Sequence, residues 1–573
     1  MTPDALDLDL PLPGSKPISN PEQAVGAWPS AMDVFAAERA AWRAACPAGR
    51  MTPALDAAVV LAAAHAARAV LALAPRAVTT LLWAEAPAWL ADLALRPDDA
   101  SLIQALDRLD QDPPSGTAEA FGLFDTLRPL AAPAEALMVT DGDPRARLDP
   151  ETGLNRYGCR AVGGADALAL SACTANEPSS TGLAAAAALR ARLMTALLSW
   201  RLQSSLTEHA GIQKRRILDW LGLGSTTDAR VMLTQSGTEA SRLAALCAHG
   251  TAKPALTLVI GPQETGREII QAVGLSPSCV GVETLAIRDG ESGAPIDPAV
   301  LTETISVRIE QARKKGLDVV LHVLEGSKTG LVAPGIDGVR TLLARFPDGL
   351  KVIADFCQMR PFGDARPYLD LGAAVVATGS KFMGGPAFSG AVILPVGWPV
   401  QAVSEALTPG TVLRWEAALA ESDAYWRLDP LHRAVGLSRF AQAVREAAAD
   451  FSEVDVLDDA QPGHILVLRI RDVESDGWMG HKDLERLNRW LAQDAHALLP
   501  SRAQSFEIRL ARQRCLLGQP VMVGPHGALR LAINAAKTAH LADTPMAAAQ
   551  LHQDVVTTLS KIALIRRYWP KNN

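Results

Sequence analysis

The sequence VATGSKFMGGPAFSG (residues 376–390) places one lysine, Lys381, among small residues directly after an apolar run. That run, residues 373–377, contains only Ala and Val and has the length of a buried strand. A lysine beside glycines is commonly a solvated loop residue. A lysine at the end of a buried strand can instead be partly desolvated, which lowers the pKa of its amine and makes it available as a nucleophile. The stretch alone leaves both interpretations open.

Similar apolar runs surround this one in the sequence and alternate with helical segments such as 183–203 and 207–222. This alternation predicts an α/β fold with a mainly parallel central sheet sandwiched by helices. Further helices and strands after about residue 400 predict a small α+β C-terminal domain. The predicted strands are residues 230–235, 255–261, 317–325, 350–356, 373–379 and 390–395 in the large sheet, and 464–471, 505–511 and 528–534 after it.

The N-terminal quarter differs in texture from the rest of the chain. Residues 30–107 are rich in Ala and Leu with helical periodicity, and residues 1–27 resemble an irregular arm. The most apolar segment, residues 57–74, is interrupted by His65 and Arg68, so we expect a packed helix and not a membrane span. The predicted domains are a helical N-terminal extension over 1–150, a large α/β domain over 151–400 and a small α+β domain over 401–573.

Composition bounds the function classes. With 573 residues, 49% hydrophobic and 20% charged, the chain is long enough for two or three folding units with ample core. The net charge of −7 argues against a nucleic-acid-binding surface. The seven cysteines form no CxxC pair and the N-terminus lacks the features of a secretion signal. We therefore expect a cytoplasmic protein with reduced thiols, no metal site, and neither nucleic acid nor membrane as partner.

The segment SGTEA (236–240) follows the first predicted strand and opens a helix. Gly237 lets the backbone approach an anion, the hydroxyls of Ser236 and Thr238 add polar contacts, and the helix N-terminus adds partial positive charge. The alternative is a helix cap, in which Ser236 and Glu239 satisfy the first backbone amides without any ligand.

Two further strand ends carry polar side chains. Asp355 closes an apolar strand, where a carboxylate is costly unless it is paired, either with a protonated ring nitrogen or with Arg360, or used as a cap. Thr378 and Ser380 flank the position of Lys381 and can hold a phosphate. An anion cradle, an acid and a lysine in this order are what pyridoxal 5′-phosphate (PLP) requires of a protein.

These segments resemble the fold-type-I PLP-dependent enzymes, specifically the class V aminotransferase and cysteine desulfurase group, over about residues 155–560. In that group an Asn-Glu-x-Gly-x-x-x-Pro segment, an Asp-x-x-Gln segment and a Ser-x-His-Lys segment follow a phosphate loop in this order. The segments that carry the resemblance are LALSACTANEP (168–178), LTQSGTEA (233–240), EGSKTGLVAPG (325–335), ADFCQ (354–358) and TGSK (378–381).

The resemblance implies PLP as cofactor, a homodimer and a site residue set. Lys381 would form the Schiff base with PLP, and Asp355 would face the pyridine nitrogen. The phenolic oxygen would lie near Ser327, which stands in the place of the Asn, and Gln358. The phosphate would be held by Ser236, Gly237, Thr238, Thr378 and Ser380.

Substrate and reaction are less constrained. Arg530, in GALRLAINA (527–535), matches the arginine with which the family grips the substrate carboxylate, and Asn176 lies in the segment near the substrate; a surface arginine on an edge strand is the alternative. Cys515, in RQRCLLGQP (512–520), lies where some cysteine desulfurases carry their persulfide-forming thiol, but free cysteine is commonly a small buried hydrophobe.

One segment departs from the family pattern. The stretch IGPQETGREIIQ (260–271) contains no histidine or aromatic residue to stack on the cofactor, so Thr265 or a neighbour would take that place. The sequence therefore predicts a PLP-dependent enzyme acting on an amino acid, with an aminotransferase-like reaction ahead of a cysteine desulfurase or other C–S or β-lyase. A non-catalytic PLP-fold scaffold or regulator is the alternative of another class.

Overall fold

The described part of the chain forms two compact units in a computed structural model. The predicted N-terminal arm, residues 1–27, lies outside the described residues. The described residues are 28–95, 117–164, 166–224, 228–250, 253–360, 364–399, 405, 407–457, 464–473 and 475–569. Unit 1 comprises Met1–Thr140, Pro144–Arg156 and Ala187–Ser205, and unit 2 comprises Asp141–Asp143, Tyr157–Ala186 and Leu206–Asn573.

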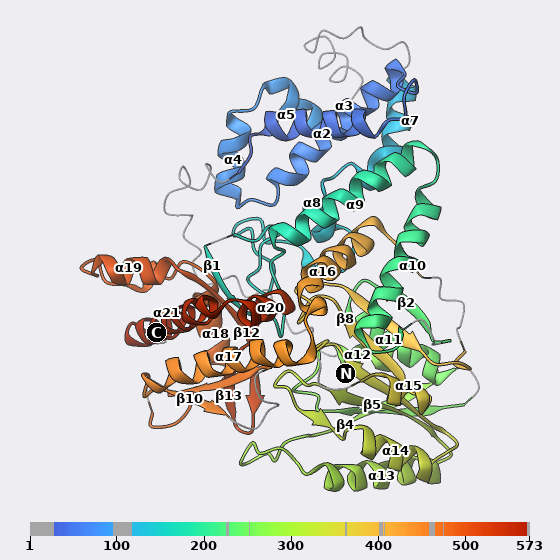
Figure 1. Cartoon of the computed structure of the whole chain (residues 1–573), viewed down its shortest axis with the longest axis vertical. Helices are drawn as coiled ribbons and strands as arrows, with labels where there is room; N and C mark the ends of the chain where they lie inside the picture. The colour runs from blue at the N-terminus through green and yellow to red at the C-terminus, as the bar shows by residue number, and fades with distance from the viewer. Residues whose placement is uncertain are drawn as a thin grey trace, which may run out of the picture. The chain divides into compact units, whose positions relative to one another are not determined.

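Unit 1 is helical in its described part, as expected for the N-terminal extension (Figure 1). Its central helix is α3 (Pro53–Leu71), which packs against α2, α5 and α7. Helix α3 begins where Thr52 accepts a hydrogen bond from the backbone amide of Leu55 and proline occupies the first turn. The other helices of this unit are α2 (Ala31–Ala45), α4 (Arg76–Ala84), α5 (Ala88–Leu95), α7 (Thr117–Leu127), η1 (Arg128–Leu130), α8 (Ala134–Thr140) and η2 (Pro144–Ala146).

Two of the described helices, α3 and α9 (Ser180–Leu198), are long and apolar enough to cross a membrane by length and composition. In α3, 72% of the apolar window is buried inside the protein, and in α9 44% is buried. The burial of α3 agrees with the expectation of a packed helix at residues 57–74, because its apolar side chains already contact other protein elements.

Unit 2 contains an eight-stranded sheet with the order β2-β9-β8-β7-β5-β3-β4, in which β6 pairs with β5. All pairs between β8 and β4 along this order are parallel, and the antiparallel pairs are those that β9 makes with β2 and β8 and that the short β6 makes with β5. The predicted mainly parallel sheet is therefore confirmed, and its six predicted strands all exist. The strands are β2 (Arg230–Thr234), β3 (Ala255–Ile260), β4 (Cys279–Leu285), β5 (Asp318–Glu325), β6 (Val332–Ala333), β7 (Leu350–Phe356), β8 (Ala374–Thr378) and β9 (Gly390–Leu394).

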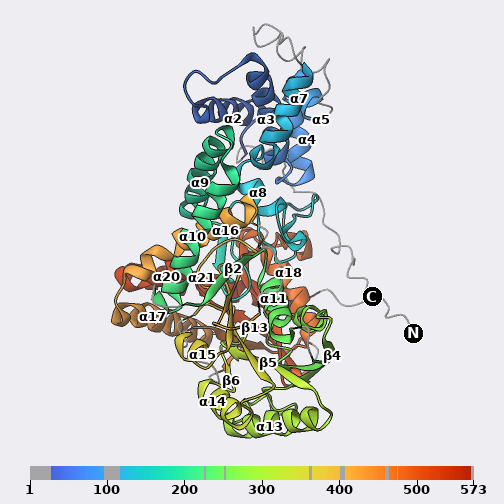
Figure 2. The same ribbon diagram turned by 90° about the vertical axis from the view of Figure 1, so that its right-hand side faces the viewer.

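Helices cover both faces of this sheet, which explains why its central strands are apolar on both sides. One face packs on α11 and α12, and the other on a larger core that includes α10, α13, α14 and α16. Helices α13 and α14 lie side by side in both ribbon views (Figures 1 and 2). The helices of this layer are α10 (Leu202–Trp220), α11 (Gly237–His249), α12 (Ile269–Gly274), α13 (Pro298–Lys314), α14 (Ile336–Arg345), α15 (Arg366–Asp370) and α16 (Pro409–Arg427).

A second sheet of five strands, with the order β1-β12-β13-β11-β10, also belongs to unit 2. Its strand β1 comes from the segment before the large sheet, so the 151–400 domain predicted from the sequence contributes one strand to the C-terminal sheet. The strands are β1 (Ala167–Leu170), β10 (Val454–Leu457), β11 (Leu466–Ile470), β12 (Arg514–Val523) and β13 (His526–Leu531). The accompanying helices are α17 (Pro430–Ala449), α18 (His481–Ala492), η4 (His496–Leu498), α19 (Ser505–Arg512), α20 (Ala535–Asp543) and α21 (Pro545–Arg567).

The predicted strand at 505–511 is wrong, because this segment forms helix α19. Gln504 and Glu507 exchange hydrogen bonds in a capping box that starts the helix. The buried residues Glu507 and Ala511 then lie four apart, which is one helical turn. The strand that the prediction sought is β12, which begins two residues after α19 ends.

Candidate active site

Asp355 and Lys381 lie at the same edge of the large sheet. Strands β7 and β8 are parallel neighbours, with Asp355 opposite Val376, and β8 ends at Thr378. The carboxyl ends of parallel strands open a crevice at one edge, where ligands bind in sheets of this kind. Asp355 is 8% exposed, and Lys381 is half-buried. The lysine is therefore neither a free loop residue nor a sealed core residue.

The loop that carries Lys381 is held by packing and by one amide. Asn176 donates from Nδ2 to the carbonyl oxygens of Ser380 (2.9 Å) and Lys381 (2.8 Å). A Cβ at Gly385 would lie 2.4 Å from the Cβ of Ala418 on α16. Gly385 therefore lets the loop pack closely against helix α16. Asn176, predicted near the substrate, therefore holds the backbone of the lysine loop.

The carboxylate of Asp355 is held at both oxygens. Its Oδ1 accepts from the backbone amide of Cys357 (2.8 Å), and its Oδ2 accepts from the hydroxyl of Thr265 (3.0 Å). The alternative ion pair with Arg360 does not form; the Arg360 guanidinium donates instead to the carbonyl oxygens of Ala172 and Ile533. Thr265 belongs to the segment 260–271, which contains no aromatic residue. The structure therefore places this segment beside Asp355.

The predicted phosphate loop forms the N-terminus of α11. Ser236 caps the helix by accepting from the amide of Glu239 (3.3 Å), and the Glu239 carboxylate accepts from the amide of Gln235 (2.8 Å). The capping interpretation is thus realised, but it does not exclude an anion. A Cβ at Gly237 would lie 2.7 Å from Cγ2 of Thr378, so the loop and the end of β8 meet as predicted. The Thr378 hydroxyl itself donates to the carbonyl of Cys357 (2.7 Å).

Gln358 and Ser327 differ in how their polar atoms are used. Gln358 donates from Nε2 to the carbonyl of Cys173 (3.4 Å), while its buried Oε1 has no hydrogen-bond partner among the described residues. The hydroxyl of Ser327 donates to Oε2 of Glu264 (2.5 Å) and accepts from the amide of Leu331 (3.1 Å). Ser327 is therefore occupied within the protein, and only Gln358 offers an unused polar atom.

Sequence reasoning missed a buried network beside this edge. Glu264 forms an ion pair with Arg288, both almost fully buried, and it also accepts from Ser327 and Thr329. Arg288 further donates to the hydroxyl of Thr329 (2.9 Å) and to the carbonyl of Gly293 (2.8 Å). The segment EGSKT, which contributes Ser327 and Thr329 to this network, differs visibly from the family pattern. A lysine, Lys328, stands where that pattern has its glutamate.

Arg530 is 1% exposed and points to the turn that contains Cys173 and Thr174. It donates to the carbonyl oxygens of Gln519 (2.7 Å), Cys173 (3.4 Å) and Lys328 (3.0 Å) and to the hydroxyl of Thr174 (2.9 Å). The alternative of a surface arginine is excluded. Protein acceptors already use most of the N–H donors of Arg530, so few remain for the predicted contact with a substrate carboxylate.

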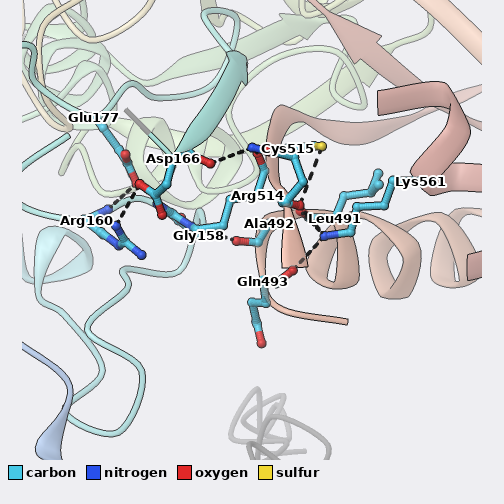
Figure 3. A network of polar contacts seen from close by, with 11 residues as sticks. Gly158, Arg160, Asp166, Glu177, Leu491, Ala492, Gln493, Arg514, Cys515 and Lys561 are labelled. Atoms are coloured by element: carbon cyan, nitrogen blue, oxygen red, sulfur yellow. Dashed lines mark hydrogen bonds and ion pairs between the residues drawn. The ribbon is translucent and has the colours of Figure 1, made fainter. Parts of the chain in front are cut away.

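Cys515 lies in the core of the second sheet. It is 0% exposed on β12, and burial raises the pKa of its thiol. Its side chain joins the cluster that contains Leu517, Leu529 and Leu531, so it lies on the opposite face of the sheet from Arg530. The thiol and the ammonium of buried Lys561 both donate to the carbonyl of Gln513. Figure 3 shows the side chains of Cys515 and Lys561 near each other. This placement matches the buried thiol that the sequence allowed and gives no support to a persulfide.

The residues at the sheet edge fit a bound PLP. The unused Oε1 of Gln358 is a buried polar atom that needs a partner, and an unpaired atom of this kind is costly. The missing side chain of Gly237 lets the N-terminus of α11 approach Thr378 at the end of β8, and Asp355 presents an oriented carboxylate one strand away. A half-buried lysine completes the set. Among the described residues, no group of three His, Cys, Asp or Glu side chains is placed to hold a metal ion.

Neither a family model nor a curated protein matches the sequence. Among solved structures, the chain is similar to an Oryza sativa protein named TDC, solved with PLP and tryptamine (14% identity, 72% of this chain and 85% of that chain, TM-score 0.46). It is also similar to a NifS-like protein from Rickettsia africae (12%, 61% and 89%, 0.39) and to a PLP-bound serine palmitoyltransferase variant from S. paucimobilis (12%, 62% and 78%, 0.40). With TM-scores below 0.5, these likenesses place the chain in no family.

Proposed function

We propose that the protein is a PLP-dependent enzyme that acts on an amino acid, with an aminotransferase-like reaction. One observation carries the proposal: Asp355 lies at the end of β7, Lys381 follows its parallel neighbour β8, and the N-terminus of α11 meets the end of β8 at Thr378. An oriented acid, an amine and an anion-binding helix end at one sheet edge are the protein parts that PLP chemistry needs. The family resemblance of the same segments supports this interpretation.

When bound, PLP supplies an aldehyde that reacts with amines and a ring that accepts electrons. Lys381 would hold the cofactor and, once released, would move the proton at the substrate Cα as base and then as acid. Asp355, fixed by Thr265 and the amide of Cys357, would keep the ring nitrogen protonated. Gly237, Thr238 and Ser380 would bind the phosphate together with the first amides of α11, and Gln358 would contact the phenolic oxygen.

The proposal is tested with purified protein and added PLP. We expect a visible absorption band in the wild type and PLP that stays attached after borohydride reduction and denaturation. Lys381→Ala should lose the attachment, whereas Lys315→Ala, an exposed lysine after α13, should keep it. PLP that remains attached to Lys381→Ala would refute the assignment of the lysine.

The choice among reactions is tested with a panel of amino acids. Transfer of the amino group to a keto acid supports the aminotransferase-like reaction, and release of sulfide or alanine from cysteine would favour a desulfurase or C–S lyase. If sulfide release disappeared in Cys515→Ser, the buried thiol would have to become accessible. PLP binding with no spectral response to any amino acid would instead support a non-catalytic scaffold.

We also propose that the enzyme is a homodimer, because the resembling family builds its site between two subunits. We propose the cytoplasm as its location because the seven cysteines form no CxxC pair. Light scattering of the purified protein tests the oligomeric state. A monomer that retains full activity would contradict this part of the proposal without affecting the assignment of Lys381.

A further inference from the structure

Arg530 has little hydrogen-bonding capacity left for a ligand. A guanidinium has five N–H donors, and a bidentate grip on a carboxylate uses two of them in parallel. In Arg530, Nε donates to Gln519, one terminal nitrogen donates to both Lys328 and Cys173, and the other donates to Thr174. These contacts use four donors, so one N–H remains without a partner among the described residues. Arg530 is built to hold its surroundings in place.

Lys328 is the residue whose backbone Arg530 holds. Its carbonyl accepts from Arg530 (3.0 Å), and its amide donates to the carbonyl of Glu264 (2.8 Å), so its peptide groups are anchored on both sides. Its ammonium, in contrast, has a single contact among the described residues, to the carbonyl of Gln263 at 3.5 Å. An ammonium has three donors, and at least two are therefore free for a ligand.

No carboxylate of the described residues pairs with the ammonium of Lys328. Burial, with smaller contributions from the charges of Arg530, Lys381 and Arg267, lowers the pKa of its ammonium to about 7, while the charge of Glu264 opposes this shift. The Glu264 carboxylate is already paired with Arg288, and Arg267 is paired with Glu485. A half-buried cation among cations is unfavourable unless an anion joins it.

We propose that Lys328 binds the carboxylate of the amino-acid substrate and that Arg530 is the positioning residue behind it. This inference rests on the proposed function for the identity of the ligand. An α-amino acid carries its amine and its carboxylate on the same carbon, so the groups that receive them must lie close together. The Arg530 guanidinium, which donates to the carbonyl of Lys328, also donates to the Cys173 carbonyl that accepts from Gln358. The amide of Lys328 donates to the carbonyl of Glu264, the residue before Thr265, whose hydroxyl donates to Asp355. These contacts place Lys328 beside the residues that would hold the cofactor.

The experiment uses acetate as the probe, titrated calorimetrically into cofactor-free and PLP-loaded protein at pH 6, with chloride at equal ionic strength as reference. Lys328→Met should weaken acetate binding about tenfold or more, because a charge-assisted hydrogen bond is lost. Lys328→Arg should retain binding within about threefold, since the positive charge remains. Lys315→Met, which removes an exposed lysine, should leave binding unchanged.

A second readout separates a ligand contact from a structural role. In the wild type, acetate affinity should fall as the pH rises above about 7, because the ammonium of Lys328 loses its proton there. With PLP-loaded enzyme, Lys328→Met should raise KM for L-alanine and leave reactivity toward ethylamine, which has no carboxylate, unchanged.

Unaltered acetate binding in Lys328→Met, or binding with no change between pH 6 and pH 8, would overturn the inference. Failure of the wild type to bind PLP would instead overturn the proposed function, while the acetate titration of the cofactor-free protein would still decide the role of Lys328. Equal melting temperatures of Lys328→Met and Lys328→Arg would show that any difference in binding does not come from unfolding.

Discussion

The hydroxyl of Thr265 lies 3.0 Å from Oδ2 of Asp355 and donates a hydrogen bond to it. Thr265 is 5% exposed and Asp355 is 8% exposed, so this bond is shielded from water. It joins the segment after β3 to the end of β7, two strands apart in the sheet. In the segment where the resembling family carries a ring, this protein therefore has a hydroxyl that orients the acid.

The Thr265–Asp355 bond predicts a measurable loss of stability when the hydroxyl is removed. Thr265→Val keeps the side-chain shape but leaves Oδ2 of a buried carboxylate without its donor. Hydrogen bonds to charged groups contribute about 1.5–3 kcal/mol, so we expect the free energy of unfolding in urea to fall by this amount. PLP affinity should fall as well, because the acid loses its orientation.

Thr304 provides the matched control for this substitution. Its hydroxyl donates to the carbonyl of Val300 on the exposed surface of α13. Thr304→Val should change the free energy of unfolding by less than about 0.5 kcal/mol. Equal effects of Thr265→Val and Thr304→Val would show that the bond to Asp355 contributes nothing specific.

The sequence predicted the large sheet well because its strands are buried on both faces. Runs such as 350–356 and 373–377 are mostly apolar, and the polar residues Asp355 and Thr378 lie near the carboxyl ends of the strands that these runs form. Strand β4 was not predicted from the sequence, because it lies at the sheet edge and its side chains are half-buried or exposed. Helix α19 was mistaken for a strand because its capping box involves Gln504, a residue that is not a common helix cap.

The glycines of the lysine loop give a second prediction. The Cβ of Gly385→Ala would lie 2.4 Å from Cβ of Ala418 and 2.9 Å from the carbonyl oxygen of Gly379. Relief of this overlap requires backbone shifts that cost about 1–3 kcal/mol, and it displaces the loop that carries Lys381. We expect a lower urea midpoint and weaker PLP binding. Gly290→Ala, where nothing lies within 4 Å of the new Cβ, should have neither effect.

The roles of the individual site residues were harder to predict than their positions. Ser327 follows β5 and Arg530 lies on β13, and their hydrogen-bond partners, Glu264 and Thr174, come from distant segments that only the fold brings into contact. Motif spacing specifies which residue follows which strand. It does not specify how many donors remain free after the protein has used its own acceptors.

The ion pair between Glu264 and Arg288 predicts a large effect of removing one partner. Arg288→Met would leave a carboxylate that is 2% exposed without its cation, which costs about 3–5 kcal/mol in comparable buried pairs. Glu264→Gln in the Arg288→Met background should restore part of this stability, because it removes the uncompensated charge. We expect both changes in urea unfolding monitored by circular dichroism.

An exposed ion pair serves as the control. Arg345 pairs with Glu303 (3.1 Å) and Glu310 (2.6 Å) on the surface of α13 and α14. Arg345→Met should cost less than about 1 kcal/mol. A similar cost for Arg288→Met would mean that Glu264 is solvated or protonated in the folded protein, contrary to the buried network.

Acid conditions should destabilise the protein through His322 on β5. Burial, together with the charge of His249, lowers the pKa of His322 to about 3, whereas an unfolded histidine has a pKa of about 6.5. Between these values the unfolded chain takes up a proton that the folded protein refuses. The stabilising contribution of the neutral imidazole is therefore complete above about pH 6.5 and is lost as the pH falls toward about 3, by up to about 1.4 kcal/mol per pH unit.

Urea midpoints at pH 7.5, 6 and 5 should show a shallower decline in His322→Leu than in the wild type. His540→Leu, which removes an exposed histidine on α20, should keep the wild-type slope; equal slopes in all three proteins would place the acid sensitivity at other groups.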